Sequence, residues 1–402
     1  MVAAVVATGR GLAKSADPLE AELFGSLMLS MLETDPGERP ERRFEVVGRL
    51  LDALPARRHA GSLAVALALA AVLPEPWREH ARSVATSMAA DGIPLPTWAP
   101  TAGRARYVAS WAMTDEFGDQ DLIVASFEHE GHPPHAISLT ADHNFHGLFR
   151  QAAVGVDADL ILREWGEISP IPLRPMTARD LAGRWAAGTG WYRRYLDPPV
   201  YEDVPRVMAL LEARASALPV PPEVEEPAEP TGEDRRAILD RFFASPFGVG
   251  LDGGHDELAY AVVEQLIDFR LEHGEGDPLR WSPIVVEIAL LDWLPRKAVL
   301  TEEEVNVLPD VLRAFVRYAG AEKGLADDDL AETIASIDHF EPEFRGSISD
   351  SDSFGMGKRI ALEIQRDGVD VTDPAALQAW MDAFNERPIE ERDDVLGPMP
   401  PL

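Results

Sequence analysis

The sequence contains no cysteine among its 402 residues. This absence excludes disulfide bonds, zinc ribbons, cysteine-ligated iron–sulfur clusters and thiol nucleophiles, and it fits a reducing cytoplasm. Lysine is also scarce, because arginine supplies all but four of the 37 basic residues. The four lysines are Lys14, Lys297, Lys323 and Lys358. Such a preference for arginine indicates a high-GC genome and no particular activity.

The chain also lacks an apolar run long enough to cross a bilayer. The longest one, Leu63–Leu73, is about half as long as the roughly 20 residues that a spanning helix needs. The first residues, MVAAVVATGRG, carry no cationic segment ahead of their short apolar run, so they do not predict a secretory signal. We therefore expect a cytoplasmic protein that does not associate with membranes.

Positive charge is in deficit. The chain has 69 acidic and 37 basic residues, and its formal net charge is −32. Such a surface repels phosphate backbones and anionic lipids, so neither nucleic acid nor a membrane is expected as a partner. The charge suits a protein partner with a basic surface. Two alternative explanations of the negative charge are ordinary solubility and mimicry of a nucleic acid.

Apolar periodicity and proline content divide the chain into four regions. We predict a helical region over 1–100 with a loose start over 1–17, a small α+β region over 101–218, a Pro/Glu linker over 219–232 and an acidic all-helical domain over 233–402. The chain from residue 232 onward has 37 Asp and Glu against 16 Lys and Arg, a net charge of −21. About two-thirds of the acidity therefore belongs to the C-terminal domain.

Strands are predicted only around residues 104–141. Residues 107–114, 122–127 and 136–141 are rich in β-branched and aromatic side chains, and turns with Gly or Pro separate them. A helix is expected to follow over Leu148–Val154. A small antiparallel meander needs a cover, because an isolated hairpin is only marginally stable. The predicted fold class is therefore mainly α, with a helical N-terminal layer, the β-meander packed on helices, and an all-α C-terminal domain.

Five histidines and one aspartate gather in this central stretch. They are His129, His132, His135, Asp142, His143 and His146. Imidazole is the commonest metal ligand near neutral pH, and a carboxylate adds charge. If the second and third strands pair, His129 and His135 meet at one end of the hairpin, whereas Asp142, His143 and His146 lie at the other end. One ion is therefore not expected to bind all six.

The predicted metal ligands are His135, Asp142, His143 and His146. A divalent metal held there would activate a water molecule for hydrolysis. The competing interpretation is a polar loop and a helix start that Asp142 caps. The sequence has no HExxH motif or other metal-ligand spacing of high specificity.

No catalytic motif identifies the chain as an enzyme. The GxSxG and SxxK patterns are absent from the sequence. The glycine-rich segment Gly248–Gly254 follows no predicted strand, which argues against a dinucleotide-binding loop. Serine triads assemble in space rather than in sequence, so the motifs leave the enzymatic question open.

The last third of the chain carries a family resemblance. The segments that carry it are Asp277–Pro283, Asp292–Lys297, and Gly368–Asp370 through Asp382–Asn385. They resemble the C-terminal helical module of a family of uncharacterised actinobacterial proteins. This resemblance implies a helical C-terminal region and agrees with the arginine-rich composition. It implies no activity and no catalytic residue.

These observations favour a non-enzymatic interaction or regulatory protein that meets its partner through an acidic helical surface. No cofactor is expected in that role. The first alternative is a metal-dependent hydrolase centred on the histidine and aspartate cluster. The second is an acidic mimic of nucleic acid that binds a cationic groove.

Overall fold

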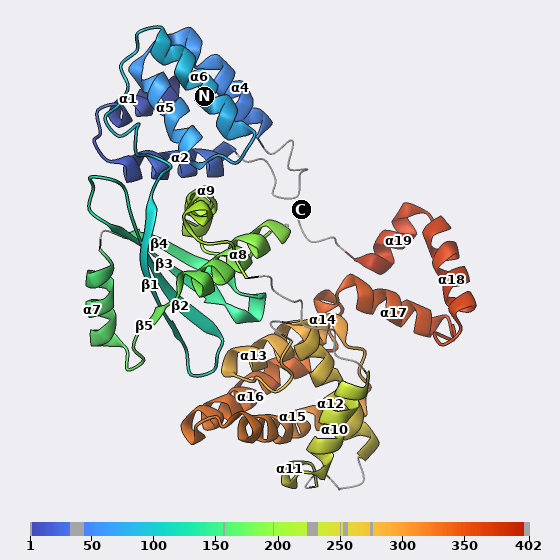
Figure 1. Cartoon of the computed structure of the whole chain (residues 1–402). Helices are drawn as coiled ribbons and strands as arrows, with labels where there is room; N and C mark the ends of the chain where they lie inside the picture. The colour runs from blue at the N-terminus through green and yellow to red at the C-terminus, as the bar shows by residue number, and fades with distance from the viewer. Residues whose placement is uncertain are drawn as a thin grey trace. The chain divides into compact units, whose positions relative to one another are not determined.

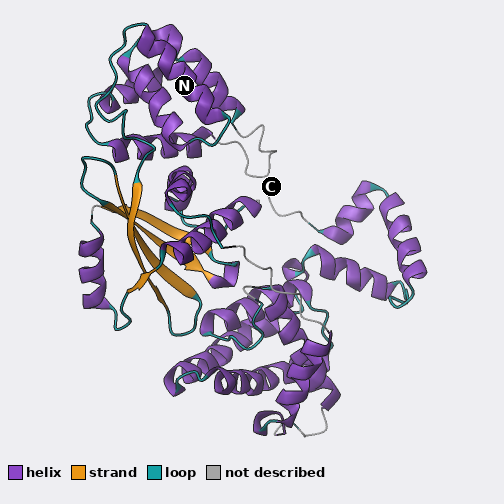
Figure 2. Ribbon diagram, viewed as in Figure 1, coloured by secondary structure: helices purple, strands orange, loops and turns teal. Residues whose placement is uncertain are grey.

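The computed structural model describes residues 2–32, 44–155, 157–195, 197–222, 232–249, 251, 256–273 and 276–397. The chain divides into two compact units, Met1–Glu226 and Pro227–Leu402 (Figure 1). This division falls inside the predicted linker, of which residues 223–231 lie outside the described residues. The fold is mainly helical with one small antiparallel sheet, which confirms the predicted class (Figure 2). No helix among the described residues is both long and apolar enough to cross a membrane.

The first unit begins with a helical layer. Its helices are α1 Val2–Leu12, α2 Pro18–Leu32, α4 Glu45–Ala53, α5 Ala60–Val72 and α6 Trp77–Ala90. Helix α5 is apolar on all sides and lies in the middle of the layer, where it contacts α1, α2 and α6 (Figure 1). A helix that is apolar all round is typical of a position where other helices surround it.

The expectation of a loose N-terminus is wrong for Val2–Leu12, which forms α1. Two glycines let α1 approach α5 closely, because a Cβ on Gly9 would lie 2.4 Å from the carbonyl oxygen of Gly61. Val5 and Val6 are buried in the core of the layer. Tertiary packing therefore stabilises a helix whose local signals are weak.

The sheet has five strands in the order β4-β3-β2-β1-β5, and all neighbours are antiparallel (Figure 2). The strands are β1 Arg106–Thr114, β2 Gln120–Glu128, β3 His135–Asp142, β4 Leu148–Gly155 and β5 Arg174–Met176. The first three strands are the predicted meander. The helix expected over Leu148–Val154 is wrong, since this segment is β4. Its Ala, Arg and Gln residues favour a helix locally, but pairing with β3 overrides that preference.

Helices cover both faces of the sheet. Helices α8 (Ala178–Arg194) and α9 (Asp203–Arg214) lie on one face, and α7 (Ala158–Ile168) lies on the other (Figure 1). The side chains of β2 alternate accordingly: Phe127 joins the core with α8 and α9, whereas Val124 joins the cluster with α7.

Helix α9 connects the sheet to the helical layer. It packs along α2, and the backbone N–H of Leu210 donates to Ser26 Oγ at 3.1 Å. Leu19 and Leu23 of α2 contact the core on the α8–α9 face of the sheet. The N-terminal layer and the sheet therefore form one body.

The second unit is helical throughout its described residues. Its helices are α10 Gly232–Ala244, α11 Pro246–Val249, α12 Asp256–Glu272, α13 Pro283–Glu287 continued by a π-helical segment Ile288–Trp293 into α14 Leu294–Lys297, α15 Glu302–Lys323, α16 Asp327–Ser347, α17 Met356–Arg366, α18 Pro374–Glu386 and α19 Ile389–Leu396. An aromatic core that includes Phe242, Phe269 and Phe315 holds α10–α16 together. Helices α17–α19 enclose a smaller cluster around Trp380 and Phe384.

Candidate functional site

The β2–β3 hairpin separates the predicted ligands. Phe127 pairs with His135 at one end, and Gln120 pairs with Asp142 at the other. Asp142 lies seven positions after His135 along β3, roughly 23 Å at the usual rise of an antiparallel strand. His135 therefore lies apart from the other three predicted ligands. His129 does lie beside His135, as the hairpin predicts, with ring centroids 5.3 Å apart.

The His135 end of the hairpin is a buried polar network centred on Glu22. Nε2 of His129 lies 2.9 Å from Glu22 Oε1, and the backbone N–H of Gly103 donates to the same oxygen at 2.6 Å. Arg214 donates from Nη2 to Glu22 Oε2 at 2.5 Å and to Nε2 of His135 at 3.1 Å. Three separate segments of the chain thus converge on the carboxylate of Glu22 in α2.

The network fixes the charge of its members. Burial alone would raise the pKa of Glu22, but the hydrogen bond from His129 and the charge of Arg214 outweigh it and lower the pKa to about 2. Burial lowers the pKa of His135 to about 3, and the neighbouring positive charges of Arg214 and His129 act in the same direction. Glu22 is therefore ionised and His135 neutral near neutral pH.

Aromatic rings close the network on one side. Phe127 stacks on His135 with centroids 6.2 Å apart, and the guanidinium of Arg214 lies 5.5 Å from the Phe127 ring centroid. Glu22, His129, His135 and Arg214 are each 4% exposed or less. These groups are deeply buried, and their mutual contacts connect separate segments of the first unit.

Asp142 begins a turn at the opposite end of the hairpin. Its Oδ1 accepts from the backbone N–H of Asn144 at 2.9 Å, which caps the short 3₁₀ turn His143–Phe145 as the sequence suggests. Arg150 donates to Asp142 Oδ2 at 3.0 Å. Burial raises the pKa of Asp142, although the Asn144 and Arg150 contacts oppose the shift.

His143 contacts a different carboxylate. Its Nε2 lies 2.9 Å from Oδ2 of Asp121, a fully buried residue at the start of β2. Thr114 donates from Oγ1 to Asp121 Oδ1 at 2.5 Å, and Arg184 of α8 forms an ion pair with Asp121. The sequence singled out neither Asp121 nor its ion pair with Arg184. Asp121 directly precedes the apolar segment 122–127, and a carboxylate next to a buried strand segment is the signal that could have indicated it.

His146 packs its ring against an aromatic side chain of α8. Its backbone is left-handed, with φ 57°, and its ring stacks on Trp191 with centroids 4.1 Å apart. Across the described ranges, no group of three or more His, Asp or Glu side chains is arranged to hold a metal ion. Asp142, His143 and His146 each have protein contacts of their own, and the metal site stays a prediction.

Glu22 and Arg214 were also missed by the sequence reasoning. Glu22 lies at helical spacing with Gly25, Ser26 and Leu29, all on the buried face of α2. A lone carboxylate on such a face predicts a buried cationic partner. The sequence does not identify Arg214 as that partner, because it lies 192 residues away.

The second unit offers an accessible site at the turn between α15 and α16. A shallow groove of about 360 Å³ runs along α16, where Leu330 and Ile334 are half-buried and Ala331 and Ala335 are exposed. Arg317, Asp327 and Asp338 complete the lining. The groove combines an apolar strip with charged edges.

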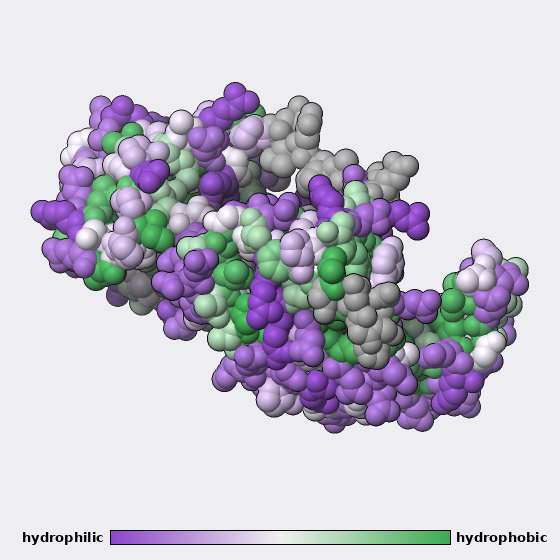
Figure 3. Space-filling view, turned by 90° about the horizontal axis from the view of Figure 1, so that it is seen from below, coloured by the Kyte–Doolittle hydropathy of each residue, from purple (hydrophilic) through white to green (hydrophobic). Residues whose placement is uncertain are grey.

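Exposed carboxylates surround this turn. They are Glu322 at the end of α15 and Asp327, Asp328 and Glu332 on α16. None of the four has an ion-pair partner within the part of the chain that the structure describes. Hydrophilic residues also cover much of the molecular face seen in Figure 3. The turn therefore presents uncompensated negative charge next to apolar surface.

No protein-family model, curated protein or solved structure matches this chain.

Proposed function

We propose that the protein is a non-enzymatic interaction or regulatory protein whose C-terminal unit binds a protein partner with a basic surface. The observation that carries this proposal is the α15–α16 turn, where exposed and unpaired carboxylates flank an apolar groove. The most conspicuous polar clusters of the sheet are engaged in internal contacts, which leaves this surface as the better candidate for recognition.

The groove suits one end of an amphipathic helix. Leu330 and Ile334 are four residues apart, as are Ala331 and Ala335, so together they form a strip along about two turns of α16. A partner helix would place its apolar face on this strip and its Lys or Arg residues beside Asp327, Asp328 and Glu332. The net charge of −21 from residue 232 onward would steer such a partner toward the unit.

A labelled cationic amphipathic peptide of Lys and Leu tests the proposal by fluorescence anisotropy. The control is a peptide of the same composition whose sequence is scrambled so that it has no apolar face. We expect the full-length protein to bind the amphipathic peptide more tightly than the scramble, because only the former can use the groove. Raising the NaCl concentration from about 50 to about 500 mM should weaken binding at least tenfold through screening.

The location of the binding site is tested by a variant that combines Asp327→Asn, Asp328→Asn and Glu332→Gln and so removes three negative charges. The control neutralises Glu390→Gln, Glu391→Gln and Asp393→Asn on α19, which removes the same charge from another exposed segment. We expect about fivefold weaker binding for the first variant and less than twofold for the control. Equal losses would show general attraction to a negative protein and would remove the proposed site.

A further inference from the structure

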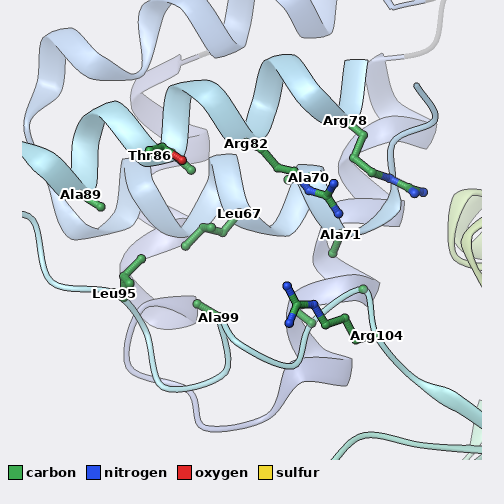
Figure 4. Close-up of a pocket in the computed structure, with 13 residues that line it drawn as sticks. Leu67, Ala70, Ala71, Arg78, Arg82, Thr86, Ala89, Leu95, Ala99 and Arg104 are labelled. Atoms are coloured by element: carbon green, nitrogen blue, oxygen red, sulfur yellow. The ribbon is translucent and has the colours of Figure 1, made fainter. Parts of the chain in front are cut away.

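A second hollow lies in the N-terminal layer, between α5, α6 and the connecting segment 91–105 (Figure 4). Its volume is about 430 Å³. Its walls are made of small and apolar side chains together with three arginines. The lining includes Leu67, Ala71, Arg78, Arg82, Ala99 and Arg104. The size is in the range of small-molecule sites.

The arginines are uncompensated in a strongly acidic protein. No carboxylate lines the hollow, and Arg82 and Arg104 are exposed without an ion-pair partner in the described ranges. Arg78 donates from Nε to the carbonyl oxygen of Leu73 at 2.8 Å and likewise forms no ion pair there. Figure 4 shows Arg82 extending from α6 and Arg104 from the connecting segment, with Ala71 of α5 between them. Unpaired positive charge is thus concentrated at one edge of an apolar hollow.

The walls are fixed by the surrounding structure. Trp98 is fully buried, and its Nε1 donates to the carbonyl oxygen of Leu12 at 2.9 Å, which anchors the connecting segment. Gly103 adopts φ +74° and lies so close to α5 that a Cβ would be 3.1 Å from Cα of Ala71. Its N–H donates to buried Glu22 at 2.6 Å. These contacts hold the backbone of the connecting segment against α5, so this wall of the hollow is in place before a ligand binds.

We propose that this hollow binds a small organic anion, with a phosphate or carboxylate head and a short apolar tail. The guanidinium groups of Arg82 and Arg104 would hold the head, because each offers paired N–H donors that match two anionic oxygens. The tail would lie against Leu67, Ala99 and the alanines of α5. The site belongs to the first unit, and it does not depend on the partner surface proposed for α15–α16.

Isothermal titration calorimetry on the full-length protein tests the ligand class with four probes. Phenyl phosphate and hexanoate carry both a charged head and an apolar tail, inorganic phosphate carries only the head, and hexanol only the tail. We expect at least one tailed anion to bind tenfold or more tightly than inorganic phosphate and hexanol. The stronger of phenyl phosphate and hexanoate identifies the head. Equal binding of all four probes, or no heat from any of them at millimolar concentration, would overturn the proposal.

Variants assign the binding to this hollow. Arg82→Gln and Arg104→Gln should each lower the affinity for the tailed anion about tenfold, because each removes a charge-assisted pair of hydrogen bonds. Ala99→Phe should abolish binding by filling the space. Arg49→Gln is the control, since Arg49 is an exposed arginine of α4 outside the lining. Unchanged affinity in both lining-arginine variants, or an equal loss in Arg49→Gln, would show that the anion binds elsewhere.

Discussion

At the scale of single residues, the first unit buries a charged carboxylate, Glu22, and specific hydrogen-bond donors stabilise that charge. Removing a carboxylate from water is costly unless hydrogen bonds and an opposite charge replace its hydration. Glu22 receives donors from His129, Arg214 and Gly103, and it is completely buried. The lowered pKa of about 2 follows from these partners and not from the burial itself, which acts in the opposite direction.

Replacing Glu22 with Gln is therefore expected to destabilise the first unit strongly. The substitution leaves the Arg214 charge buried without its carboxylate, which typically costs about 3–5 kcal/mol. Urea unfolding followed by tryptophan fluorescence measures the change. Glu20→Gln is the control, because Glu20 is exposed on the same helix and should shift the free energy of unfolding by less than about 0.5 kcal/mol. Similar effects of the two substitutions would contradict the importance of the network.

His135 should make stability sensitive to mildly acidic pH. Its folded pKa of about 3 lies below the ordinary value of 6.5, so the unfolded chain binds more protons between these values. The stabilisation is complete above about pH 6.5 and declines as the pH falls, by about 2 kcal/mol between about pH 7 and about pH 5. Glu22 adds to this decline only below its ordinary pKa of 4.5.

His135→Gln isolates that contribution, since the amide oxygen can still accept from Arg214 but does not titrate. We expect the variant to lose most of the pH dependence between about pH 7 and about pH 5, measured as the urea midpoint at each pH. His80→Gln, at a partly exposed surface ion pair, should retain the wild-type dependence. An unchanged slope in His135→Gln would show that another group titrates.

At the scale of elements, close packing decides what local sequence signals leave undetermined. Residues 1–17 have neither strong caps nor a strong apolar stripe, yet Val2–Leu12 is helical because glycines bring it against α5. Leu148–Val154 has helix-forming residues, yet it is a strand because β3 offers a free edge. Both departures from the sequence-based prediction result from packing or pairing with another element, α5 for Val2–Leu12 and the adjacent strand β3 for Leu148–Val154.

Two glycines of α1 provide a matched test of this packing. Gly9→Ala places a Cβ 2.4 Å from a backbone oxygen of α5, so the helices must separate. We expect a loss of about 1–3 kcal/mol in the free energy of unfolding. For Gly11→Ala, no atom lies within 4 Å of the added Cβ, and the better helix propensity should be neutral or stabilising by up to about 1 kcal/mol. Thermal unfolding of both variants measures the difference, and equal shifts would refute the close-approach argument.

Across the whole molecule, negative charge is distributed unevenly. Residues from 232 onward carry −21 of the net charge of −32, and many of their carboxylates are exposed. Such repulsion opposes folding of a compact unit and is screened by salt.

Salt should therefore stabilise the protein. Raising NaCl from about 20 to about 500 mM at neutral pH is expected to increase the unfolding temperature by a few degrees, because the Debye length becomes shorter than most separations between surface charges. Differential scanning calorimetry measures the shift. The variant Asp327→Asn, Asp328→Asn and Glu332→Gln should show a smaller shift than the wild type. A temperature that is independent of salt would indicate that repulsion does not limit stability.

The sequence by itself determined the mainly helical class, the small antiparallel meander and the acidic C-terminal part. These properties depend on composition, short-range periodicity and turn residues, which are readable within a few positions of the chain. Only the tertiary structure decided that His129 and His135 belong to a network with Glu22 and Arg214, and that the arginines of α6 and Arg104 line one hollow. Such groupings depend on contacts between residues that are distant in sequence, and local patterns do not encode which partners meet.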